Sequence, residues 1–140
     1  MKKYLGIDLG SVTIGMATSN TGIIATSYKT LRFVKDNYEM AVTLILEVVK
    51  ELKIDIVVLG LPKHMNNDLG IRGEISLKVQ EELLKKNQEI SVILQDERLS
   101  TKIAVKSMNH IKTNKKSVVK ENKDSLAAQV ILQNYLDSLK

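Results

Sequence analysis

The chain has 140 residues, a net charge of +5, and 44% apolar and 26% charged residues. This length is that of one ordinary domain, so residues 1–140 are predicted to form a single domain with a packed core, and the composition excludes wholesale disorder. The absence of cysteine excludes disulfides, thiolate nucleophiles and Cys-ligated zinc. Asp8 interrupts the only N-terminal apolar stretch, and no transmembrane run is present, so the protein is expected to be soluble and cytoplasmic, without a membrane partner.

Three β-rich segments open the chain, at residues 3–9, 12–19 and 22–30. The turn residues 20–22 between the second and third segments are typical of a hairpin, so the three segments are predicted to form an antiparallel meander. At residues 36–52 the apolar positions become three and four apart, which indicates an amphipathic helix.

The rest of the chain alternates strands and helices. Apolar, β-branched runs at 54–59 and 90–95 are typical of buried parallel strands, and helical spacing is expected at 74–86, 100–108 and 124–139. Residues 109–123 hold five lysines and few apolar residues, so they are predicted to be a mobile basic loop. The order of elements implies an α/β fold, with one mixed five-stranded sheet and helices on both faces.

Acidic residues fall where functional groups of such sheets gather, at the carboxyl ends of parallel strands. Asp8 is near the end of the first strand, Asp96 and Glu97 follow the fifth, and Asp124 opens the last predicted helix. Singly, Asp8 could be satisfied by the backbone of the next turn, Asp124 could be a helix cap, and the acid pair could face solvent. Together they indicate a hard-cation site for phosphodiester hydrolysis, with Mg²⁺ or Mn²⁺ as the cofactor.

Arginine is rare in this Lys-rich chain and occurs only as Arg32, Arg72 and Arg98. Arg72 and Arg98 are expected at the same sheet edge, where a guanidinium binds phosphate bidentately; pairing with a nearby carboxylate is the alternative. The basic segment precedes Asp124 directly and is expected to follow a phosphate backbone, the alternative being a solvated linker. Its lysines are Lys112, Lys115, Lys116, Lys120 and Lys123.

Four motifs in order resemble those of the YqgF/RuvX family of RNase H-like nucleases. They are Gly6-Ile7-Asp8-Leu9-Gly10-Ser11, Gly60-Leu61-Pro62 with Met65, Asp96-Glu97-Arg98-Leu99-Ser100-Thr101, and Asp124-Ser125-Leu126-Ala127-Ala128 continuing to Leu136. The resemblance covers essentially the whole chain and implies an RNase H-like fold with sheet order 3-2-1-4-5. It also implies a divalent-metal nuclease that processes the 5′ end of pre-16S rRNA or resolves Holliday junctions in branched DNA.

By the same resemblance, Asp8, Glu97 and Asp124 are the catalytic and metal-ligating acids, and Asp96 either ligates metal or orients Arg98. Ser11, in the first motif, is expected to contact nucleic acid. The expected partners are pre-rRNA or branched DNA and ribosomal particles, with the protein acting as a monomer or homodimer.

The chain departs from the family pattern in two places. The sequence has Val12-Thr13 where a basic pair is frequent, and residues 66–68 read Asn-Asn-Asp where Asp-Gly or Asn-Gly is usual. Both departures fall where nucleic acid should pass, and neither touches the acids.

Two other functions remain open from sequence. Asp8-x-Gly10-Ser11 also resembles the first phosphate loop of sugar kinases and actin-like ATPases, although a chain of 140 residues lacks the second half that those proteins need. A non-catalytic nucleic-acid-binding protein would use the positive charge equally well. The presence of all three acids favours catalysis.

Overall fold

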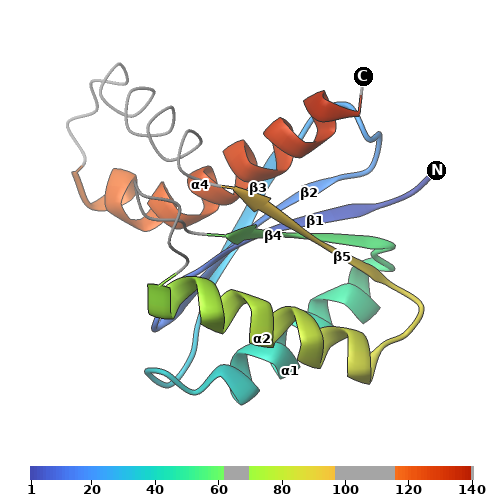
Figure 1. The fold of residues 1–140 in the computed structure, drawn as a ribbon. Coiled ribbons are helices and arrows are strands. Elements are labelled where there is room, and N and C mark those ends of the chain that lie inside the picture. Colours follow the sequence, from blue (N-terminus) through green and yellow to red (C-terminus); the bar gives the residue numbers. More distant parts are fainter. Residues whose placement is uncertain (62–69, 97–115, 140) are drawn as a thin grey trace.

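The sheet has five strands and mixed direction (Figure 1). The computed structural model describes residues 1–61, 70–96 and 116–139, with side chains at 1–61, 73–95 and 125–139. The elements in chain order are β1 (Tyr4–Leu9), β2 (Thr13–Ser19), β3 (Thr26–Arg32), α1 (Tyr38–Leu52), β4 (Ile56–Leu61), α2 (Gly70–Lys86), β5 (Ser91–Asp96) and α4 (Lys116–Ser138). The strand order is β3-β2-β1-β4-β5, with an antiparallel β1–β2–β3 meander and parallel β1, β4 and β5. This confirms the predicted sheet.

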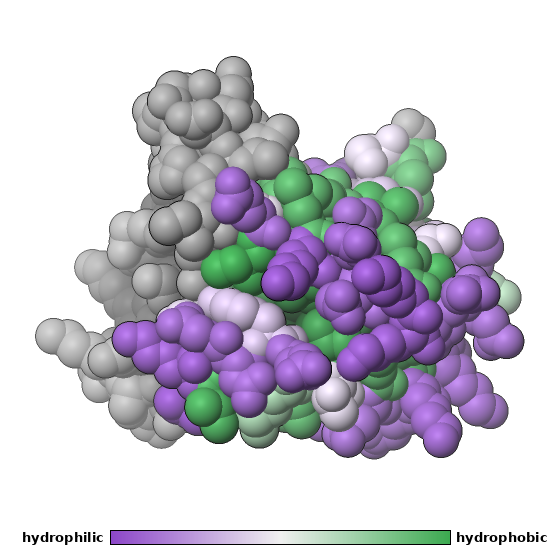
Figure 2. Space-filling view, turned by 60° about the horizontal axis from the view of Figure 1, so that its bottom comes forward, coloured by the Kyte–Doolittle hydropathy of each residue, from purple (hydrophilic) through white to green (hydrophobic). Residues whose placement is uncertain are grey.

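Helices cover both faces of the sheet, α1 and α2 on one side and α4 on the other (Figure 1). Residues of β1 alternate between the two sides: Leu5 and Ile7 pack with α1 and α2, whereas Tyr4 packs with α4. Turned so that the α1 and α2 side comes forward, the molecule presents a largely hydrophilic surface with scattered hydrophobic residues (Figure 2). No helix in the described parts of the chain is long and apolar enough to cross a bilayer.

The third strand starts four residues later than predicted, at Thr26. The preceding segment is bound by two glutamine side chains of α4 instead of by a strand. The Gln133 side chain accepts from the Ala25 N–H at 2.9 Å and donates to the Ile23 carbonyl at 2.8 Å, and Gln129 donates to the Ala25 carbonyl at 3.0 Å. Because the amides satisfy the backbone groups that a ladder would otherwise pair, the chain leaves the sheet here without a hydrogen-bonding cost.

The predicted basic loop at 109–123 is wrong in its second half, because residues 116–123 are helical and belong to α4. Lysine and glutamate are good helix formers, and this stretch contains neither glycine nor proline. The apolar positions further along anchor the helix to the sheet, and the helix extends upstream from them through a stretch whose only apolar residues are Val118 and Val119. Asp124 therefore lies inside the helix and is not its N-cap. The predicted helix at 100–108 and residues 109–115 lie outside the described residues.

Gly6 is where α4 approaches β1 most closely. A Cβ atom on Gly6 would lie 2.7 Å from Leu132 Cβ and 2.9 Å from the Ala128 carbonyl oxygen. Toward the start of β1, the rings of Tyr4 and Tyr135 lie 6.3 Å apart. Moving forward along β1 therefore means moving backward along α4, so the helix runs antiparallel to the strand.

We expect Gly6→Ala to destabilise the protein by about 1–3 kcal/mol, because the added methyl group overlaps atoms of α4 and forces the helix outward. The sign of this change in the free energy of unfolding is informative, since replacing a glycine by alanine where space exists stabilises a protein by about 0.4–1 kcal/mol. Urea unfolding monitored by circular dichroism measures the difference. An unchanged or higher midpoint would contradict the close approach.

Candidate functional site

The carboxyl ends of β1, β4 and β5 meet at one edge of the sheet. The parallel register aligns Ile7 with Leu59 and Leu59 with Leu94, and it ends with Leu61 opposite Asp96. The acid near the end of β1 and the acid at the end of β5 therefore belong to the same edge, as the sequence predicted.

Asp8 lies on the face of the sheet that α4 covers. Its neighbours Ile7 and Leu9 pack with α1 and α2, so the alternation of the strand turns Asp8 to the other side, the side of Gly6. Asp8 is half-buried, and the residue opposite it in β2 is Gly15, which has no side chain. The carboxylate thus stands two residues beyond the contact of Gly6 with α4, about 7 Å further along the strand.

The antiparallel course of α4 carries position 124 toward the carboxyl edge. Gly6 lies against Ala128 and Leu132, and Asp124 precedes Ala128 by four residues, which is about 6 Å along a helix axis. The step from Gly6 to Asp8 along β1 has the same general direction. Positions 8 and 124 therefore both lie beyond the contact at Gly6, on the side of the carboxyl edge.

The remaining predicted site residues are described to different extents. Ser11 has a described side chain, whereas four residues are placed by their backbone alone: Asp96 at the end of β5, Arg72 in the first turn of α2, and Lys116 and Asp124 in α4. Four others lie outside the described residues: Glu97, Arg98, Lys112 and Lys115.

Among the described side chains, no group of three His, Asp or Glu residues could hold a metal ion. Of the predicted ligands, Asp8 alone has a described side chain.

The turn after Asp8 is braced by the segment that follows β3. The Gly10 N–H donates to the Thr13 carbonyl at 2.8 Å and closes the turn. The Phe33 N–H donates to the Val12 carbonyl and the Asp36 N–H to the Ser11 carbonyl, each at 2.9 Å. These bonds hold Ser11 at the carboxyl edge, next to the end of β1.

Two cavities border the described residues, and neither includes Asp8 or Ser11. One of about 430 Å³ lies between α1 and α2, lined by Tyr38, Val42 and Val79 among others. The second, of about 480 Å³, lies near Ile54 and Ile90, before β4 and β5, at the end of the sheet opposite the acids. Neither cavity involves the acidic edge.

The sheet order, the helices on both faces and the acid on the first strand define an RNase H-like fold of the resolvase type. The solved structure of Thermus thermophilus RuvC in complex with a Holliday junction substrate superimposes with a TM-score of 0.63 at 12% identity, covering 99% of this chain and 96% of that one. Fowlpox virus resolvase in complex with Holliday junction DNA gives 0.59 at 12% identity, covering 98% of each chain. At these identities the likeness concerns the fold alone.

The chain belongs to the RuvX family, described as Holliday junction resolvase, whose profile matches residues 2–138. A relative from Onion yellows phytoplasma (strain OY-M) is 46% identical over 138 residues, covering 97% of this chain and 89% of the relative. One from Staphylococcus carnosus (strain TM300) is 45% identical over 141 residues, covering 98% and 96%. Both carry the name "Putative pre-16S rRNA nuclease". The family predicted from the four motifs is thereby confirmed.

Sequence reasoning missed the part that Gly6 plays in this site. The signal was a glycine inside a buried, mainly apolar strand, which often marks the close approach of another backbone. Here that backbone belongs to α4, which carries Asp124.

Asp36 has a positive φ of 61°, an unfavourable conformation for a residue with a Cβ atom. We expect Asp36→Ala to be about 1 kcal/mol less stable than Asp36→Gly, because only glycine adopts this conformation without steric cost. Both variants lose the 3.3 Å bond that the Tyr38 hydroxyl donates to the Asp36 carboxylate, so their difference isolates the backbone. Thermal unfolding measures this difference in stability. Equal stabilities of the two variants would contradict a strained backbone at Asp36, the residue whose N–H binds the Ser11 carbonyl.

Proposed function

We propose that the protein is a divalent-metal-dependent nuclease that processes the 5′ end of pre-16S rRNA, with residues 1–140 as one nuclease domain in the cytoplasm. The observation that carries the proposal is the position of Asp8, half-buried near the carboxyl edge on the face that α4 covers, with α4 running so that position 124 lies toward the same edge. Family membership supports nuclease chemistry. The names of the relatives favour pre-16S rRNA as the substrate. We propose that the protein meets this RNA in ribosomal particles.

Cleavage of branched DNA is the second candidate function. It is favoured by the description of the family, Holliday junction resolvase. The two functions use the same acids, and they differ in the shape of the nucleic acid that is bound.

The donor set fits a hard divalent cation. Asp8, Glu97 and Asp124 supply carboxylate oxygens only, the ligands that Mg²⁺ and Mn²⁺ prefer. Gly15, which lies opposite Asp8 in β2, has no side chain that would occupy the space next to the carboxylate. When bound, such ions activate a water molecule and stabilise the leaving oxygen of the phosphodiester.

The strand alternation favours Glu97 over Asp96 as a ligand. In β5, Ile93 packs in the cluster on the α4 side, whereas Val92 and Leu94 pack on the other side. Position 96, the last of the strand, has the parity of Val92 and Leu94 and belongs to that other side. Asp8 is on the α4 side, so we assign Asp96 to an orienting role toward Arg98 and, from the resemblance of the motif, Glu97 to the metal site.

The basic residues of the proposal neutralise the phosphate backbone on either side of the cleaved bond. Phosphate contacts supply most of the affinity in nucleic-acid binding and carry no sequence information directly. The residues assigned to this role are Ser11, Arg72, Arg98, Lys112, Lys115 and Lys116.

We expect Asp8→Asn to abolish cleavage with the fold intact, because it removes a ligand charge at nearly constant volume. The matched control is Asp55→Asn, an exposed acid just before β4 at the opposite edge of the sheet. The assay is cleavage of a labelled pre-16S rRNA 5′ leader and of a synthetic four-way DNA junction, each with Mg²⁺, with Mn²⁺ and with EDTA.

A second measurement on the same proteins does not depend on activity. Added Mn²⁺ should raise the melting temperature of the wild type and of Asp55→Asn, since a ligand that binds only the folded state stabilises it. Asp8→Asn should show little increase. Metal-dependent cleavage by Asp8→Asn would overturn its assignment, and cleavage of the junction alone would replace the RNA substrate by branched DNA.

Substitution of each of the two adjacent acids tests which of them is a metal ligand. We expect Glu97→Gln to lower kcat by at least about 100-fold, because it removes a metal ligand, and Asp96→Asn to lower it by less than about tenfold. Single-turnover cleavage of the RNA leader measures both variants, with circular dichroism as the control for folding. The reverse order of effects would place Asp96 in the metal site.

A further inference from the structure

Arg32 ends the edge strand β3 on the same face of the sheet as Asp8. Its neighbours in the chain, Leu31 and Phe33, both pack in the cluster of α1 and α2. Because side chains alternate along a strand, Arg32 turns to the other side, the side of Asp8 and α4. The strand pairing places Arg32 on the same side. Arg32 lies opposite Thr13, and Thr13 is two residues before Gly15, the partner of Asp8, so these positions share one face of the sheet.

Arg32 also lies at the carboxyl edge. The antiparallel register aligns Asp8 with Gly15 and Gly15 with Thr30, so Arg32 is two strands across from Asp8 and two residues further toward the edge. With a strand spacing of about 4.8 Å and a rise of about 3.3 Å per residue, the Cα atoms of Arg32 and Asp8 are roughly 12 Å apart. The bond from the Phe33 N–H to the Val12 carbonyl fixes the end of β3 against the turn that follows β1.

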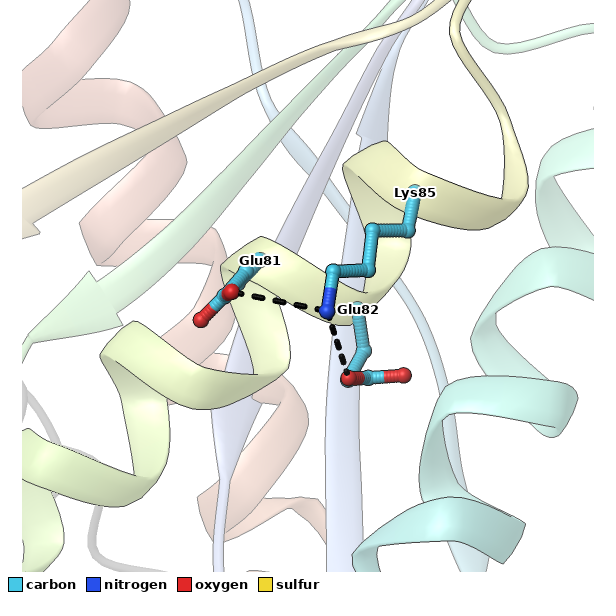
Figure 3. A network of polar contacts seen from close by, with 3 residues as sticks. All are labelled: Glu81, Glu82 and Lys85. Atoms are coloured by element: carbon cyan, nitrogen blue, oxygen red, sulfur yellow. Dashed lines mark ion pairs between the residues drawn. The ribbon is translucent and has the colours of Figure 1, made fainter.

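Arg32 is exposed to solvent. Within the described residues, the ion pairs found are those of Lys85 with Glu81 and Glu82, at 3.5 and 3.8 Å on the exposed side of α2 (Figure 3). An exposed guanidinium on this face is a bidentate donor to phosphate oxygens.

We propose that Arg32 binds a backbone phosphate of the substrate a few nucleotides from the cleaved bond, so that the nucleic acid crosses the sheet from Asp8 over β2 toward the β3 edge. The inference rests on the proposed function. The turn after Asp8 carries no charge at Val12-Thr13, and Arg32, opposite Thr13, supplies a positive charge to this same side.

The test compares Arg32→Gln with Lys29→Gln. Lys29 is exposed in the same strand, but it pairs with Met16, which packs with α1 and α2, so its side chain belongs to the opposite face. Each variant removes one positive charge from β3. The probe is a fluorescently labelled pre-16S rRNA 5′ leader, and its affinity is measured by anisotropy in EDTA from 50 to 300 mM salt.

We expect Arg32→Gln to weaken binding about tenfold near 0.1 M salt and to reduce the slope of log affinity against log salt by about 0.7–0.9, the loss of one phosphate contact. Lys29→Gln should leave the slope unchanged. Arg32→Lys should restore the slope but only part of the affinity, because an ammonium keeps the charge without the bidentate geometry. Equal slopes for Arg32→Gln and Lys29→Gln, or a wild type that does not bind the RNA, would overturn the inference.

Cleavage separates this inference from the proposed function. Arg32→Gln should raise KM and leave kcat at saturating RNA within about threefold of the wild type, because the acids are untouched. If the wild type cleaves RNA while the slopes of both variants are equal, only the assignment of Arg32 fails. If the wild type binds RNA with the expected slopes but cleaves no nucleic acid with any metal, the nuclease proposal fails and the contact by Arg32 stands.

Discussion

The candidate site depends on the contact between the backbone of β1 at Gly6 and the helix α4. With no Cβ on Gly6, the Ala128 carbonyl and the Leu132 side chain come closer to the strand than any other residue would allow. This contact sets the height of α4 above the sheet and its position along β1. Asp8 and Asp124 both lie beyond this contact, toward the carboxyl edge, so the position of α4 relative to the acidic edge depends on a glycine that takes no part in chemistry.

Because side chains alternate along the strands, the two faces of the sheet differ in composition and in role. The side covered by α1 and α2 is a continuous apolar cluster that stabilises the fold through burial. On the side covered by α4, the second half of that helix buries Ile131, Leu132 and Leu136, and its Gln129 and Gln133 bind the segment before β3. The first half of α4 is rich in lysine and carries Asp124, so the helix is anchored at one end and brings charge to the carboxyl edge at the other.

Much of the fold could be predicted because its signals are local. The β-branched runs of β4 and β5 and the apolar spacing of α1 follow from short stretches of chain, and the turn at Gly22, with φ of 76°, has the residue that its conformation requires. The errors lay where long-range contacts decide. Residues 23–25 have side chains typical of a strand, but their backbone binds to glutamines of α4. Residues 116–123 have the composition of a polar loop, but they belong to a helix that packs on the sheet through residues further along the chain.

For the candidate site, the sequence by itself determined which residue types are present and their order: Asp8 in a buried strand, acids after β5, and Asp124 before an apolar helix, a pattern sufficient to identify the family. It did not determine which acids share a face or how far apart they lie. Those relations depend on strand register, on the direction of α4 and on the close approach at Gly6, all of which join residues that are far apart in the chain, such as Tyr4 with Ile56 and Gly6 with Leu132. The position of Arg32 beside this edge has the same origin, since only the pairing of β3 with β2, and of β2 with β1, brings the end of the edge strand to the face of Asp8.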